Sequence, residues 1–203
     1  MPTNNPTASP AVHSTIGLKN VVIAPVTKDD TTGVTYGDLQ LMAGAIEATI
    51  NPGNNEADIQ YADDIEFDAL YPDPEITVTM NMVDIPLAIQ EMLLNNTLDD
   101  NGVLVRNAND KPGYFALGFK SEKTNHKFRY VWLFKCRAKP IQENYGTKEG
   151  PNINRRTGTI EFTAIKRTYD NYCQATADEG ENGFTAANAA TFLTSVYTPT
   201  VTP

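Results

Sequence analysis

The sequence predicts a mainly β fold with one flanking α-helix, arranged as a sandwich or barrel with long loops. About seven or eight segments are short apolar runs or alternate apolar with polar residues, as strands do. One segment, residues 84–96, has clear helical periodicity. Two loops, 51–75 and 141–156, are longer than compact domains usually keep, and such loops are commonly functional.

Length and composition favour one β domain with two arms. The 203 residues, 40% of them hydrophobic, can bury roughly 70% of the unfolded chain's surface. We expect a flexible N-terminal arm at 1–15, a β domain at 16–183 and a C-terminal arm at 184–203 that can include a short helix. No apolar run is long enough for a membrane helix, and no signal peptide is evident. We therefore expect a protein that folds in a cytoplasm, without a membrane partner.

The expected strands follow the chain in a simple order. The first lies within 17–27 and precedes a loop at 27–38, and 39–50 reads as a strand with a helical alternative. A short strand is expected at 59–62, within an otherwise irregular excursion. The clearest alternation is at 76–82, and residues 114–138 predict a hairpin with its tip at 121–126. A last strand begins at 158, and residues 170–183 are polar.

The helix predicted at 84–96 has a recognisable start. Asp84 is the expected N-cap, and Pro86 suits the first turn. Its apolar stripe comprises Ile85, Ile89, Met92 and Leu93. We expect this stripe to lie across a sheet, with Ile89, Met92 and Leu93 in the core.

The segment KFRYVWLFKCRA at 127–138 has two contrasting faces if it alternates throughout. One carries large apolar residues, of which we expect the following in the core beneath the helix: Phe128, Tyr130, Trp132 and Phe134. The alternative for this aromatic face is a subunit interface. The other face carries four cations, Lys127, Arg129, Lys135 and Arg137.

The charges are distributed unevenly in a chain of net charge −9. Residues 120–139 contain seven Lys or Arg and one Glu, whereas residues 51–75 contain eight Asp or Glu and no Lys or Arg. Two solvated faces would explain this distribution. Complementary patches on one molecule would equally explain it, and would build a head-to-tail ring or filament. On that hypothesis the four cations meet acids of a neighbouring subunit, for which the candidates are Asp63, Asp64, Glu66 and Asp68.

The sequence contains no constellation that predicts catalysis. Two cysteines and two histidines are too few for a typical zinc site or a histidine-based triad, and no glycine-rich phosphate loop is present. Segments 51–56 and 99–102 resemble parts of calcium loops but lack the ligand spacing. A pI near 4.7 argues against a general nucleic-acid binder. We expect a non-enzyme without cofactor or metal.

Several blocks resemble, in the same order, the major tail proteins of long non-contractile tailed bacteriophages that infect Gram-positive bacteria. The two most specific blocks are MAGAIEATINP and YFALGFKS with KFRYVWLFK. The others are GLKNVVIAPVT, YADD, EITVTMNMVDIPLAIQEMLL and TIEFTAIKR. The resemblance extends from about residue 16 to about residue 170.

This resemblance implies a tail-tube β-sandwich or barrel with one flanking helix, assembled in rings of six that stack into a hollow tube. The tube would carry viral DNA without binding it specifically, and would contact the tape measure protein and other tail proteins. It would belong to the virion tail and be assembled in the host cytoplasm. Other ring-forming proteins of similar fold are the alternative: a tail terminator, a secretion-system tube or a capsid decoration protein.

Overall fold

The structure is a computed structural model that describes residues 12–53, 58–62, 65–70, 75–143, 145–147 and 157–200. Its strands and helices in chain order are β1 Thr15–Asp30, β2 Gly33–Tyr36, β3 Gln40–Leu41, β4 Ala45–Asn51, β5 Asp58–Ala62, β6 Ile65–Leu70, β7 Ile76–Met82, α1 Leu87–Leu94, β8 Thr97–Leu98, β9 Leu104–Val105, β10 Tyr114–Lys123, β11 Phe128–Ala138, β12 Gly158–Ala164, β13 Gln174–Asp178 and α2 Ala186–Thr191. The prediction of a mainly β fold with a flanking helix is confirmed.

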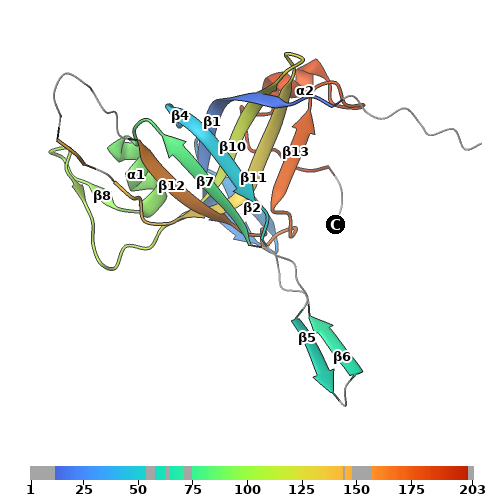
Figure 1. Cartoon of the computed structure of the whole chain (residues 1–203). Coiled ribbons are helices and arrows are strands. Elements are labelled where there is room, and N and C mark those ends of the chain that lie inside the picture. The colour runs from blue at the N-terminus through green and yellow to red at the C-terminus, as the bar shows by residue number, and fades with distance from the viewer. Residues whose placement is uncertain are drawn as a thin grey trace, which may run out of the picture.

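One antiparallel sheet of nine strands organises the chain (Figure 1). Its main order is β2-β1-β10-β11-β12-β7-β4, with β3 beside β1 and β13 beside β11. The sheet curls so that β1 approaches β4. Long sheets with the usual twist tend to curl in this way, which encloses the apolar side chains of one face.

The enclosed face forms the larger of two apolar clusters, which we call the inner core. The alternation predicted at 76–82 is realised in β7, where Ile76, Val78, Met80 and Met82 are buried in it. Helix α1 adds Ile89 and Leu93, with Met92 packed partly buried against the cluster. The burial of one β7 face and one α1 face in the same cluster explains why both patterns were readable in the sequence.

The second cluster, here the aromatic cluster, lies on the opposite face of the sheet. It consists of the buried residues Val22, Ala116, Tyr130, Trp132, Phe134 and Phe192, with Phe128 partly buried against it. The C-terminal segment 184–200 covers this cluster. The prediction that these aromatic residues lie in the core beneath α1 is therefore wrong about the covering element. Trp132 Nε1 donates a 2.8 Å hydrogen bond to the carbonyl oxygen of Phe192. The segment expected to be a C-terminal arm is thus folded onto the sheet, with α2 as its short helix.

Strand β11 does not alternate uniformly, because a bulge interrupts it. Its register with β10 shifts between the pairs Cys136–Phe115 and Leu133–Leu117. Before the bulge, Tyr130, Trp132 and Phe134 belong to the aromatic cluster; beyond it, Cys136 joins the inner core. A bulge adds a residue to one strand and changes which face the next side chain meets. The single apolar face expected across 127–138 is therefore split between two clusters.

Other boundaries differ from the predicted ones. The segment 27–38, predicted as a loop, is a hairpin in which β1 continues to Asp30 and pairs with β2. Helix α1 has Pro86 at its N-cap with no side-chain cap, so Asp84 does not cap it. The polar stretch 170–183 contains β13, which pairs with the first half of β11.

Gly118 illustrates how tightly the aromatic cluster is packed. A Cβ atom at Gly118 would lie 2.7 Å from the ring of Trp132, and that ring is fully buried. We expect Gly118→Ala to lower the free energy of unfolding by about 1–3 kcal/mol, the usual cost of overpacking. Chemical denaturation measures this, with Gly113→Ala as control because nothing lies within 4 Å of its added Cβ. Equal stability of the two variants would contradict the packing described.

Candidate assembly surface

The described residues offer little chemistry. Among them, no group of three His, Cys, Asp or Glu side chains could hold a metal ion. The Cys136 thiol is fully buried, and burial raises its pKa, which makes it a poor nucleophile. No described helix is both long enough and apolar enough to span a bilayer. The charged side chains and the exposed borders of the sheet are features that can support a contact between proteins.

Two of the four candidate interface cations have carboxylate partners within the chain. The first is Arg129, whose Nε and one terminal nitrogen donate 2.7 Å hydrogen bonds to the two oxygens of Asp178. Lys123 Nζ donates to the same carboxylate at 2.9 Å. The bond from Arg129, with that from Lys123, lowers the pKa of Asp178 to about 2 despite its burial. This arrangement attaches β13 to β11 at the end of the sheet near the β10–β11 turn.

The low pKa of Asp178 predicts a pH-dependent contribution to stability. Because folding depresses this pKa from its ordinary value of 3.8, the contribution is complete above about pH 4 and is lost as pH falls towards 2. We expect Asp178→Asn to lower the urea midpoint at pH 6, and the difference from wild type to shrink between pH 4 and pH 2. A difference that stayed constant over this range would contradict the assignment. Glu181→Gln is a control at a carboxyl group in the same region.

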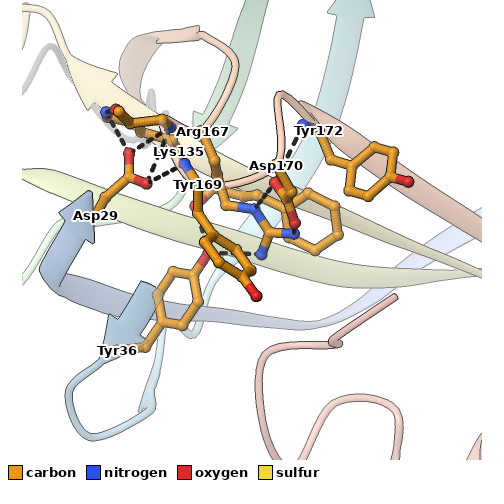
Figure 2. A network of polar contacts seen from close by, with 9 residues as sticks. Asp29, Tyr36, Lys135, Arg167, Tyr169, Asp170 and Tyr172 are labelled. Atoms are coloured by element: carbon orange, nitrogen blue, oxygen red, sulfur yellow. Dashed lines mark hydrogen bonds and ion pairs between the residues drawn. The ribbon is translucent and has the colours of Figure 1, made fainter. Parts of the chain in front are cut away.

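The second paired cation, Lys135, belongs to a polar network between β11 and the β1–β2 hairpin (Figure 2). Lys135 Nζ lies 2.5 Å from Asp29, whose carboxylate also accepts hydrogen bonds from the backbone N–H groups of Thr168 and Tyr169. Burial alone would raise the pKa of Asp29, but these hydrogen bonds lower it below its ordinary value. Asp29 therefore anchors the segment after β12 to the end of β1.

Arg167 extends this network and is a buried charge, with 1% of its surface exposed. Its guanidinium pairs with Asp170, donates to the Tyr36 hydroxyl at 3.2 Å and lies 4.0 Å from the centre of the Phe134 ring. The Asp170 carboxylate in turn accepts from the backbone N–H of Tyr172 (Figure 2). Paired and hydrogen-bonded in this way, the charge can remain buried. Its visible role is to hold the loop between β12 and β13 against the sheet.

The remaining two cations, Lys127 and Arg137, form no ion pair with any carboxylate in the described part of the chain. Arg137 lies 5.8 Å from the centre of the Tyr114 ring. Lys127 directly precedes β11 and Arg137 lies near its other end, roughly 30 Å away at the usual strand rise. The four cations therefore do not form one continuous basic surface.

The acidic candidates lie on or beside the hairpin β5–β6, which is a separate two-stranded sheet. Asp63 and Asp64 lie outside the described residues. Glu66 and Asp68 lie in β6, and of these two residues only the backbone is described. The hairpin is inserted between the end of β4, at Asn51, and the start of β7, at Ile76. Strand pairing places these two residues beside the Arg137 end of β11, because β4 pairs with β7, β7 with β12, and β12 with β11. The hairpin stands away from the main sheet at this end (Figure 1).

The position of β4 at the border of the sheet is the feature that sequence reasoning missed. It pairs with β7 along one side, and no described strand pairs with its other side. Ile46 on this strand is 53% exposed, and the nearby Val83, whose N–H donates to the Gly44 carbonyl, is 60% exposed. Leu87 at the start of α1 is also exposed. We call Ile46, Val83 and Leu87 the apolar rim; its position depends on strand order, which the sequence does not display.

Comparison with known proteins supplies the family. A search of curated proteins finds no match to the chain. The profile of one protein family, described as phage tail tube protein, matches residues 12–198. This match spans most of the 203 residues and includes most of the C-terminal segment that folds over the aromatic cluster. The chain therefore belongs to the phage tail tube protein family.

Proposed function

We propose that copies of this chain form closed rings of six and that the rings stack into the tube of a long non-contractile tail. The bacteriophage would infect a Gram-positive host, in whose cytoplasm the tail is assembled. The ring number, host class and tail type rest on the sequence resemblance, and the structural role in a phage tail rests on family membership. The tube would enclose the tape measure protein during assembly and later conduct the genome.

The observation that carries this proposal is the border of β4, which β1 approaches but with which no described strand except β7 pairs. Proteins usually protect such borders with short strands, charges, prolines or a covering segment, because an unpaired backbone edge invites another strand. β4 has seven residues, no proline and one charged residue, Glu47. The exposed Ile46 and Val83 lie close to it. An edge with these properties suits pairing with a strand of an adjacent copy, which would continue the sheet around a ring.

Charge placement suggests how successive rings meet. The acidic hairpin and Arg137 lie at one end of the subunit, whereas Lys127 lies at the other. In a head-to-tail stack, the hairpin of one subunit faces the Lys127 end of the next. We therefore propose that the acids near 58–70 contact Lys127 of the next ring. Arg129, already paired with Asp178, orders this surface, whereas Lys135, paired with Asp29, lies near the Arg137 end.

The acidic balance of the chain suits passage of DNA. DNA carries one phosphate per ~1.7 Å of axis, so a basic channel would hold it through many contacts. Each subunit has a net charge of −9, and this charge is repeated around each ring, so the ring as a whole does not attract DNA phosphates. Screening limits the repulsion to roughly 8–10 Å at physiological salt, a distance that matters in a narrow channel. We propose that DNA moves through the tube without specific binding.

A charge on the border strand should prevent assembly. We expect Ile46→Asp to fold normally, because Ile46 is more than half exposed, but to form few or no tubes in electron micrographs. Val105→Asp is the matched control, since Val105 is 51% exposed on a different small sheet. Unchanged tube yield from Ile46→Asp would contradict the β4 interface. Wild-type samples that form only single rings or monomers would contradict the tube itself and favour a terminator or decoration role.

A further inference from the structure

A groove on the outer side of the aromatic cluster has no role in the contacts proposed above. It has a volume of about 690 Å³ and lies between β13, α2 and the C-terminal residues 195–200. Aromatic rings form part of its wall: Phe192 stacks on Tyr197 with ring centres 5.0 Å apart and meets Phe184 edge to face. β13 pairs with β11 on one side, and among the described strands none pairs with the side next to the groove.

The lining predicts the chemistry of the occupant. The residues around the groove are mostly small, hydroxyl-bearing or aromatic, and none of them is charged: Ala175, Thr176, Ala177, Gly183, Phe184, Asn188, Thr191, Phe192, Ser195, Val196, Tyr197, Thr198 and Thr200. Charged residues make up 20% of the whole chain, whereas the groove lining has none, so the lining favours an uncharged occupant. Aromatic grooves of this kind suit extended, proline-containing segments, which lose little conformational entropy on binding.

One segment of the same chain has the required composition. Residues 1–11, MPTNNPTASPA, contain no charged side chain and include Pro2, Pro6 and Pro10. Extended, eleven residues reach about 35 Å, enough to cross between packed subunits. This segment lies outside the described residues and precedes the part that matches the tail tube family.

The start of the described chain is attached to the sheet at Ser14 and is exposed at Val12 before it. The Ser14 carbonyl accepts a hydrogen bond from Thr124 N–H at the β10–β11 turn, so the arm begins at the end of the sheet near α2 (Figure 1). Val12 is 91% exposed and makes almost no contact with its own subunit. We propose that residues 1–11 of a neighbouring copy occupy the groove between β13 and residues 195–200. This inference rests on the proposed self-assembly and adds a strap between copies.

A peptide titration tests the docking in single subunits. A chain that begins at Val12 is titrated with synthetic peptide 1–11, and emission of the sole tryptophan, Trp132, reports binding because its indole donates to Phe192. We expect a saturable change, about tenfold weaker for Tyr197→Ala or for a peptide with alanine at its three proline positions. Thr198→Lys, which removes no ring, should weaken binding similarly by adding a charge. The control Tyr145→Ala, with Tyr145 88% exposed and outside the groove, should bind normally.

The absence of a saturable change, or equal binding by the groove variants and the control, overturns the docking. Disulfide cross-linking then tests whether the arm comes from a neighbouring copy: Asn5→Cys chains are mixed with Thr198→Cys chains and oxidised. Linked dimers are expected, whereas links that form only within a chain carrying both substitutions overturn the assignment to a neighbour. If chains beginning at Val12 form normal tubes without binding peptide, this inference fails while the proposed function stands. If the full chain builds no tubes, the proposed function fails instead.

Discussion

Replacing Trp132 by Ala should lower the free energy of unfolding by about 3–5 kcal/mol, the range for deleting a large buried aromatic side chain. Trp132 is fully buried, its ring lies against Gly118, and its indole N–H bonds to the Phe192 carbonyl. The substitution would leave a cavity in the aromatic cluster and would remove the hydrogen bond that holds residues 184–200 to the sheet. Urea denaturation measures the lost free energy of unfolding. Limited proteolysis of the variant, at a temperature where the wild type is folded, should cleave the C-terminal segment.

Trp132→Phe separates packing from hydrogen bonding. This variant keeps an aromatic ring but loses the donor to Phe192, so we expect a smaller cost of roughly 1–2 kcal/mol. A Trp132→Ala chain with wild-type stability that merely fails to assemble would contradict the core position. It would favour the alternative in which the aromatic face of β11 is a subunit interface.

Arg167→Met should cost a similar amount, about 3–5 kcal/mol, because removing one partner of a buried ion pair leaves the other charge unpaired. Methionine replaces much of the side-chain volume, but Asp170 and the Tyr36 hydroxyl lose their donor. The loop between β12 and β13 should loosen with it. Thermal or urea denaturation provides the measurement, and exchange of the Tyr172 amide reports the loop.

Lys139→Met is the matched control for a cation in an exposed pair. Lys139 lies 2.9 Å from Glu161, and both side chains are about half exposed. Such surface pairs contribute roughly 0–1 kcal/mol, so this variant should remain near wild type. Equal losses in Arg167→Met and Lys139→Met would show that burial of Arg167 does not govern its contribution.

The elements that could be predicted are those whose patterns arise from one local face. β7 alternates because one face contacts the inner core, and α1 shows helical spacing because one side contacts the same core. The bulge in β11 was not predictable, since its register depends on β10 at Phe115 and Leu117. β13 reads as a polar loop because its formation depends on pairing with β11 about fifty residues earlier.

The charged residues show the same limit. The cations of 127–138 were predicted to meet acids of a neighbouring subunit, and sequence spacing does not show that two of them pair within the chain. Arg129 meets Asp178, 49 residues away, and Lys135 meets Asp29, 106 residues away. Both partners lie outside the acidic block 51–75. The open border of β4 was likewise hidden, because strand order in a sheet follows from tertiary pairing.

An electron cryo-microscopy map of the assembled tube would test most directly whether β4 joins adjacent copies. The account predicts a strand of a neighbouring subunit about 4.8 Å from the outer side of β4, the normal spacing of paired strands, with Ile46 and Val83 covered. A map in which this side of β4 faces solvent or the channel, with subunits joined through other surfaces, would contradict it.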